Sequence, residues 1–183
     1  KEGSFDRLSS AYELMHEKGI TSGAVTTIST KNIDILDDIM AFLIEKNVKF
    51  WQLQIGLPMG SMAVNSDMIL EPSAVDRILD FIHKNGQNGQ IKIYPADCLG
   101  YYTRKETEIR QIVFNSQVET HWDGCHAGKR SFGILQNGDI LGCTSIRDDE
   151  FIEGSIRKRP LKEIWMDAES FTWSREMNKS KLK

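Results

Sequence analysis

The segment Gly124–Cys143, GCHAGKRSFGILQNGDILGC, holds two of the three cysteines of the chain. Its centre, Asn137-Gly138, is a strong two-residue hairpin signal, because both residue types tolerate the positive φ angles of a type I′ turn. Short apolar stretches flank this dipeptide on both sides. Counting outward from a two-residue turn places Phe132 opposite Cys143. The segment therefore predicts a β-hairpin with Cys143 at its base.

Cys125 lies seven residues before Phe132, in a loop that contains glycine. Such a loop can fold back across the base of the hairpin, so the sulfurs of Cys125 and Cys143 could converge as part of one site. Three cysteines form an odd set without close paired spacing, which argues against a secreted disulfide framework. Reduced thiols or metal ligands are left as the alternatives, and we expect a cytoplasmic protein.

The composition excludes several classes of protein. The chain has 183 residues, a net charge of -3 and a hydrophobic fraction of 40%, which suits a globular domain with a small appendage. Lysines and arginines are scattered, so the surface lacks the basic footprint that nucleic acids need. No apolar run reaches the roughly 18 residues of a transmembrane helix. We therefore expect no nucleic acid partner and no membrane association.

Upstream of the hairpin, helical and strand patterns alternate. Apolar residues at periods of three and four mark the helices, and short apolar runs mark the strands. Short polar residues precede the helices, and glycine follows the first of them. The expected strands are 24–28, 49–55 and 91–94, and the expected helices begin at Ser4, Asn32, Pro72 or Ser73, and about Lys105.

This alternation is the pattern of parallel βα units with right-handed crossovers. Three strands are too few for a complete barrel, so residues 1–116 predict an α/β fold that is the second half of a partial (β/α)6, TIM-like barrel. Residues 117–183 predict a small hairpin-plus-helix appendage. Chemistry in such barrels sits at the carboxyl ends of the strands. That rule selects Ser29, Thr30, Asn32, Gln52, Gln54, the turn 58–60 and Asp97.

The spacing of cysteine, twelve residues, glycine, four residues and cysteine (Cys125, Gly138, Cys143) resembles the start of an auxiliary iron-sulfur domain. That domain follows the barrel in radical S-adenosylmethionine enzymes of the SPASM/twitch type. The continuation Gly154-Ser-Ile156 and Pro160-Leu-Lys-Glu-Ile-Trp165 is similar to the family's next strand and helix, with Ser155 in place of the usual asparagine. Upstream, 3–7, 26–32, 51–60 and 95–102 look like the second half of the family's barrel.

The resemblance implies the chemistry of the complete enzyme. One electron reaching the barrel cluster cleaves S-adenosylmethionine, and the resulting 5′-deoxyadenosyl radical oxidises or crosslinks a peptide, protein or cofactor precursor. The implied cofactors are S-adenosylmethionine and 4Fe-4S clusters, and the implied partners are that substrate and an electron donor such as flavodoxin or ferredoxin. Cys125 and Cys143 would be cluster ligands. Ser29, Asn32, Gln54 and Asp97 would bind cofactor.

Two parts of the family pattern are absent from this chain. The three-cysteine motif of the first barrel strand is missing, and no cysteine follows Cys143. A cluster usually takes four thiolates. We therefore expect the chain to be an internal piece of a longer protein, cut at both ends and inactive alone.

Each candidate residue also has a purely structural interpretation. Asn32 stands where a helix N-cap needs a short polar side chain. Gln52 and Gln54 share one side of their strand, where polar groups need partners of some kind. Asp97 could cap the loop at Leu99-Gly100.

Two other functions stay open at this point. Cys125, Cys143, His121 and His126 could bind zinc, although adjacent residues such as Cys125 and His126 ligate one ion awkwardly. Alternatively, the chain could be an interaction module whose thiols have no role.

Overall fold

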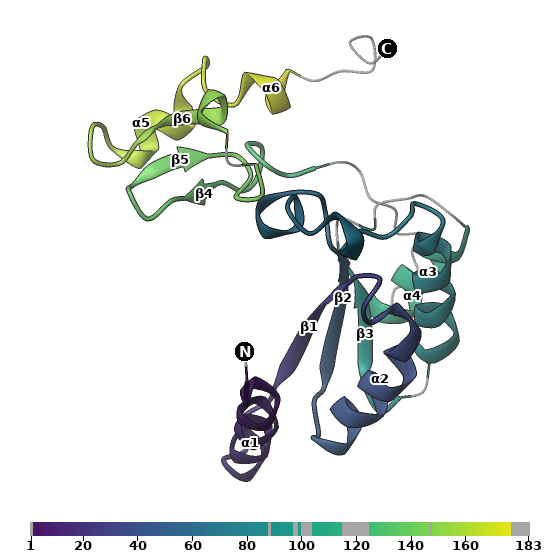
Figure 1. The fold of residues 1–183 in the computed structure, drawn as a ribbon. Coiled ribbons are helices and arrows are strands. Elements are labelled where there is room, and N and C mark those ends of the chain that lie inside the picture. Colours follow the sequence, from purple (N-terminus) through teal and green to yellow (C-terminus); the bar gives the residue numbers. More distant parts are fainter. Residues whose placement is uncertain are drawn as a thin grey trace. The chain divides into compact units, whose positions relative to one another are not determined.

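The computed structural model describes residues 2–87, 89–96, 99, 104–114, 125–146 and 148–176. The chain forms two compact units, Lys1–Trp122 and Asp123–Lys183. In the first, the strands β1 (Gly23–Ile28), β2 (Phe50–Ile55) and β3 (Lys92–Pro95) form a parallel sheet in the order β1-β2-β3 (Figure 1). Each predicted strand is confirmed to within one residue at either end.

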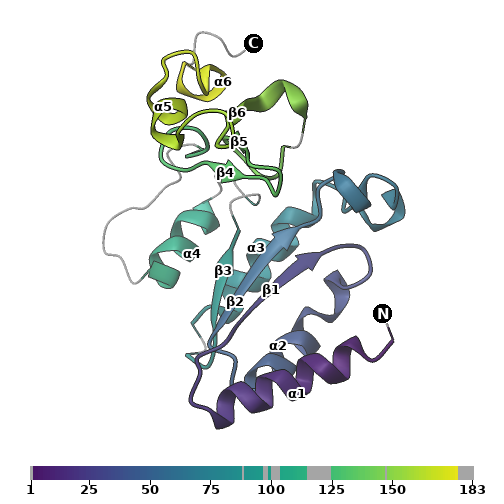
Figure 2. The ribbon, with the colours of Figure 1, turned by 90° about the vertical axis from the view of Figure 1, so that its left-hand side faces the viewer.

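The helices of this unit follow the predicted order, with α2 and α3 on one side of the sheet (Figure 1) and α1 running along its β1 edge (Figure 2). Asn32 precedes a 3-10 turn, η1, rather than the α-helix itself. The bounds are α1 (Ser4–Glu17), η1 (Ile33–Ile35), α2 (Leu36–Glu45), η2 (Gly60–Met62), η3 (Ser66–Met68), α3 (Ala74–Asn85) and α4 (Arg104–Phe114).

Both ends of α1 are set by glycine. The predicted stop at Gly19 is confirmed: its φ is 66°, and the N–H of Ile20 donates to the carbonyl of Met15 at 2.8 Å, as in a Schellman motif. Ser4 was predicted as the N-cap of this helix, and this is wrong by one residue. Ser4 is the first helical residue, and Gly3, with a φ of 70°, is the N-cap.

One face of the sheet carries the core, and the other is open. Trp51, Leu53 and Ile93 are fully buried against the helices, and the indole N–H of Trp51 donates to Thr26 Oγ1 at 2.8 Å. On the opposite face Val25 is 61% exposed and Phe50 is 41% exposed. Parallel sheets are normally covered on both faces, so this open face is unusual.

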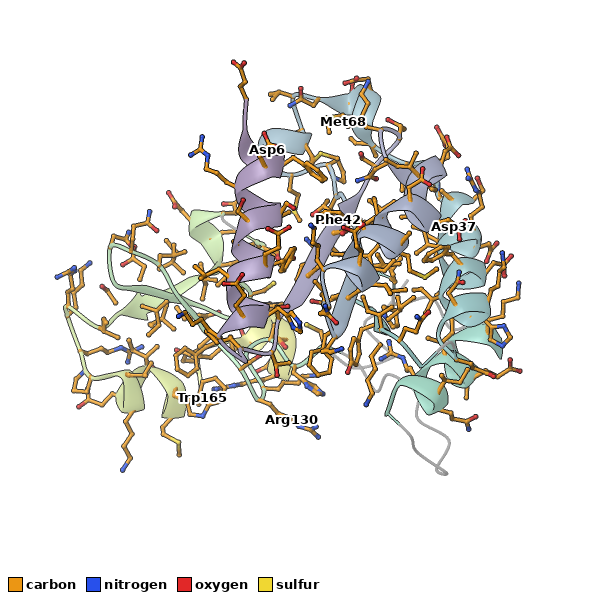
Figure 3. The ribbon with its side chains drawn as sticks, turned by 90° about the horizontal axis from the view of Figure 1, so that it is seen from below. Asp6, Asp37, Phe42, Met68, Arg130 and Trp165 are labelled. Atoms are coloured by element: carbon orange, nitrogen blue, oxygen red, sulfur yellow. The ribbon has the colours of Figure 1, made fainter. Side chains whose placement is uncertain are left out.

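The outer part of α1 is also poorly covered. Phe5 and Leu8 of its apolar pattern are 62% and 46% exposed, and only Tyr12 is buried. The ring centroid of Phe5 lies 4.9 Å from that of Phe42 (labelled in Figure 3) in α2. A cavity of about 420 Å³ is lined by residues of α1, β1 and α2, among them Val25.

The second unit is a three-stranded antiparallel sheet with two short helices. The order is β4-β5-β6, and a core of Ile140, Ile164 and Phe171 fills the space between sheet and helices. The predicted hairpin and the predicted helix after Pro160 are confirmed; the last helix was not predicted. The bounds are β4 (Gly133–Ile134), β5 (Asp139–Leu141), η5 (Asp149–Phe151), β6 (Ile152–Ser155), α5 (Leu161–Met166) and α6 (Thr172–Arg175).

The predicted register of the hairpin is wrong by one residue. Gly133 pairs with Leu141, so Phe132 falls opposite Gly142 rather than opposite Cys143. The N–H of Gly138 donates to the carbonyl of Leu135 at 2.8 Å, which makes a three-residue loop. Only Gly138 in this loop has positive φ, at 92°, whereas a type I′ turn would need it at two positions.

Asp167 joins α5 to the following turn. Its carboxylate accepts from Arg159 Nη1 at 2.6 Å and from the N–H of Glu169 at 3.1 Å. The hydrogen bond from Arg159, followed by that from the Glu169 backbone, lowers the pKa of Asp167 below its ordinary value of 3.8.

Replacing Gly138 by valine should destabilise the second unit by about 1–3 kcal/mol, because a β-branched residue is strained at positive φ. Its Cβ would also lie 3.0 Å from Arg157 Cγ. Urea unfolding of Gly138→Val measures the cost, with Gln136→Val in the same loop as control. Equal stability of both variants would contradict the loop geometry.

The lowered pKa of Asp167 gives its ion pair a defined pH dependence. The stabilisation is complete above the unfolded-state pKa and disappears as the pH falls through the lower folded-state pKa. The difference in unfolding free energy between the unmodified chain and Asp167→Asn should therefore shrink from about pH 6 to about pH 2. Glu169→Gln serves as control. A difference that is constant over this range would rule out the ion pair as the cause.

Candidate functional site

Two free thiols lie in the second unit. Cys125 is exposed and begins the loop that leads to the hairpin, and Cys143 is half-buried just after β5. The N–H of Ala127 points to Cys125 Sγ at 3.4 Å. Thiolate sulfur is the form of cysteine that ligates metal.

Gly142 brings the two cysteine segments together. A Cβ atom at Gly142 would lie 3.2 Å from the backbone nitrogen of Gly128, and 2.7 Å from Cζ2 of Trp173. The residue before Cys143 therefore packs directly on the loop that follows Cys125. This contact needs glycine, because any side chain would push the two backbones apart.

The two cysteine sulfurs suit iron-sulfur ligation, but they are only half of the ligands that one cluster usually has. Sulfur ligands are what clusters require, usually four for each cluster. Within the described residues, no group of three or more cysteine, histidine or acidic side chains is arranged to hold a metal. Cys125 and Cys143 thus form at most a partial set. Of the proposed zinc ligands, His126 Nε2 lies 3.4 Å from Arg130 Nη1, and His121 lies outside the described residues.

The carboxyl ends of β1 and β2 form the second candidate site. Thr27 is its centre: Gln54 Nε2 donates to Thr27 Oγ1 at 2.8 Å, and Asn32 Nδ2 donates to the Thr27 carbonyl at 3.0 Å. Thr27 and Gln54 are also register partners in the sheet. The structure therefore brings Gln54 and Asn32 together through one threonine, which the sequence did not single out.

Asn32 does not act as a side-chain N-cap, so that structural interpretation is wrong. Its Oδ1 accepts from the N–H of Ser29 at 2.8 Å, which folds the side chain back over the turn after β1. Ser29 is 3% exposed, and its Oγ accepts from the N–H of Lys31 at 3.2 Å. Asp97 lies outside the described residues.

The segment after β2 returns to this turn. Thr30 Oγ1 donates to the carbonyl of Asp67 at 2.7 Å, and Lys31 forms an ion pair with the Asp67 carboxylate at 3.3 Å. These contacts join the ends of β1 and β2 at one edge of the sheet. Sequence patterns gave no sign of them, since the partners are 36 or 37 residues apart.

The open face of the sheet carries a shallow cavity of about 400 Å³. Val25, Gln52 and Tyr94 lie on that face because they are register partners across the three strands. Arg110 of α4 completes the lining. The predicted placement of Gln52 and Gln54 on one side of β2 is confirmed, and that side is the open one.

None of the helices in the described residues combines the length and the hydrophobicity that a membrane-spanning segment needs.

Comparison with known proteins shows which proteins this chain is similar to. Residues 125–183 match the family model of SPASM, an iron-sulfur cluster-binding domain. The chain is 22% identical over 175 residues to the AdoMet-dependent heme synthase of Nitratidesulfovibrio vulgaris, covering 92% of this chain and 47% of that protein. It is 26% identical over 191 residues to the Fe-coproporphyrin III synthase of Methanosarcina barkeri, covering 91% and 44%.

Among solved structures, anSMEcpe with bound AdoMet and the Kp18Cys peptide has a TM-score of 0.58 and 18% identity, covering 90% of this chain and 44% of that chain. The chain thus spans about half the length of the curated relatives it matches. The domain match includes both Cys125 and Cys143, and the relatives extend through the parallel sheet. Residues 125–183 are therefore similar to an iron-sulfur cluster-binding domain, and the chain as a whole resembles radical S-adenosylmethionine enzymes of the SPASM type, one of which has been solved with bound AdoMet.

Proposed function

We propose that this chain is an internal part of a radical S-adenosylmethionine enzyme, with residues 1–116 as the second half of its (β/α)6 barrel and residues 117–183 as the start of its auxiliary cluster domain. The open face of the parallel sheet supports the first assignment. Val25, Gln52 and Tyr94 would face the barrel interior, where exposure to a closed cavity replaces exposure to solvent.

The proposal depends most on the pair of free cysteines in contacting segments. Gly142 places the backbone before Cys143 on the loop after Cys125, and the SPASM match begins at Cys125. Two thiolates are half of a usual ligand set, so the remaining ligands must come from elsewhere in the complete protein. The chain alone should therefore be inactive.

S-adenosylmethionine would bind at the carboxyl ends of β1 and β2. There Ser29, Asn32 and Gln54 are grouped around Thr27, and we also retain Asp97 as a binding residue. When bound beside the reduced barrel cluster, S-adenosylmethionine supplies the radical that removes a hydrogen atom from the substrate. The residues of this chain would orient the cofactor and exclude water from it.

For the substrate we favour a cofactor precursor of the iron tetrapyrrole class over a peptide. The curated relatives at 22–26% identity are synthases of heme and Fe-coproporphyrin III, whereas the peptide-bound neighbour shares 18% identity. The reaction would be an oxidation, with flavodoxin or ferredoxin as the electron donor. The cytoplasm suits it, since its reducing conditions keep thiols available as ligands.

In the full-length protein, Cys125→Ala and Cys143→Ala should each lower the iron content by about four atoms, one cluster's worth. Iron and sulfide analysis after anaerobic reconstitution measures this. Cys98→Ala is the matched control, because Cys98 is the third cysteine of the chain. Unchanged iron in both variants would overturn the proposal, and zinc in place of iron would favour a zinc site.

Gln54→Ala should affect S-adenosylmethionine binding and not the iron content, the opposite of the cysteine variants. Iron stays unchanged, whereas S-adenosylmethionine binds about 3- to 30-fold more weakly, as expected when one or two hydrogen bonds are lost. The two cysteine variants should retain wild-type S-adenosylmethionine binding.

The substrate class is tested by 5′-deoxyadenosine formation in the full-length enzyme. An iron tetrapyrrole with carboxylate side chains should stimulate it well above the rate without substrate, and a cysteine-containing peptide should not. If the peptide stimulates 5′-deoxyadenosine formation and the iron tetrapyrrole does not, the substrate is a peptide and the tetrapyrrole assignment is wrong.

A further inference from the structure

Helix α6 lies against the loop of Cys125. Ser174 Oγ donates to the carbonyl of Ala127 at 2.5 Å, and Arg175 Nε donates to the carbonyl of Gly128 at 2.8 Å. Ser174 is 4% exposed, so its hydrogen bond is shielded from water. Two consecutive side chains of α6 therefore hold two consecutive carbonyls of the loop that Cys125 begins.

Arg175 is fixed in place by several groups at once. Its guanidinium also donates to the carbonyls of Asp167, Ser170 and Trp165, at 3.2, 3.3 and 2.8 Å. It lies 4.8 Å from the ring centroid of Trp165 (labelled in Figure 3) and 4.6 Å from that of Phe171. The planar fork of arginine suits such a site, and the single ammonium of lysine could not serve all these carbonyls.

Glu153, at a β-bulge in β6, also contacts α6 and the residue before it. Ile140 pairs with Gly154 and Leu141 pairs with Ile152, so Glu153 is an extra residue in β6. Bulges redirect side chains. The Glu153 carboxylate accepts from the N–H of Phe171 at 2.7 Å and from Trp173 Nε1 at 3.1 Å.

The loop itself is shaped for this contact. Gly128 has a φ of 73°, and a Cβ there would lie 2.8 Å from Phe171 Cβ. On its other side Gly142 packs against Trp173 and Gly128. The Cys125 loop is thus held between α6 and the residue that precedes Cys143.

We propose that Ser174 and Arg175, held by Glu153, are positioning residues that fix the Cys125 thiolate for cluster ligation. This inference rests on the proposed function, because it takes Cys125 as a ligand. Cys125 is exposed, so its own packing cannot fix its position. The two bonds to Ala127 and Gly128 supply that constraint from 47 residues away.

The test compares Ser174→Ala with Ser155→Ala in the full-length protein. Each removes a buried serine hydroxyl that donates to a backbone carbonyl, but Ser155 donates to Gly138 at the hairpin turn, at 3.2 Å. Alkylation of the metal-free protein by iodoacetamide, followed by mass spectrometry of each cysteine peptide, reports how freely Cys125 moves. Redox titration of the reconstituted auxiliary cluster reports the ligand geometry.

Ser174→Ala should raise the alkylation rate of Cys125 about 2- to 10-fold relative to Cys143, the range expected for one lost hydrogen bond. It should also shift the cluster's reduction potential, and Ser155→Ala should do neither. Arg175→Lys should give a larger change in the same direction. If Arg175→Lys does not fold, Ser174→Ala alone decides.

If Ser174→Ala and Ser155→Ala behave alike while Cys125→Ala loses iron, the positioning role is overturned and the proposed function stands. If Cys125→Ala keeps its iron, the proposed function fails, and the ligand role of Cys125 fails with it.

Discussion

The first unit is built on a three-stranded parallel sheet that helices cover on one face only. The apolar side chains on the other face also need to be removed from water, and this need is the main constraint on the unit. Helices α2 and α3 bury Trp51, Leu53 and Ile93, whereas on the opposite face Val25 stays 61% exposed and Phe50 41% exposed. The hydrophobic effect disfavours leaving such side chains in water. A barrel satisfies the constraint by closing the sheet on itself, so that the open face becomes an interior.

The second unit combines a small hydrophobic core with hydrogen bonds from charged side chains to its backbone. Its core centres on Ile140, Ile164 and Phe171, which is small for an independent domain. Glu153 and Arg175 compensate by satisfying backbone groups that would otherwise be buried without partners. A bound cluster would add further stability, since metal binding is a common way to stabilise small units. In our proposal, hydrogen bonds that stabilise the unit also position Cys125.

The alternative functions differ in what they explain. A zinc site would use His126, yet that ring lies beside the Arg130 guanidinium, a poor surrounding for a cation. An interaction module without metal would leave two features without a role, the close approach at Gly142 and the hydrogen bond of Ala127 N–H to Cys125 Sγ. A partial cluster site accounts for both.

The elements of the first unit and their order could be predicted from the sequence alone. Apolar periodicity located β1, β2, β3 and the helices that follow them, because burial on one side leaves a local pattern. The Asn137-Gly138 dipeptide also predicted positive φ at two positions, which is confirmed for Gly138 and wrong for Asn137.

The pairing of the hairpin and the contacts of the loop after Cys125 depend on tertiary interactions. Asn137-Gly138 suits two-residue and three-residue loops alike. Residues beyond the hairpin favour the three-residue loop by bonding its carbonyls. Arg157 Nε donates to the Asn137 carbonyl at 2.7 Å, and the N–H of Ile156 donates to the Gly138 carbonyl at 2.9 Å. Ser174 and Arg175 were missed for the same reason. Their partners lie 47 residues away, and a hydrogen bond to a backbone carbonyl leaves no trace in the identity of the residue that carries it.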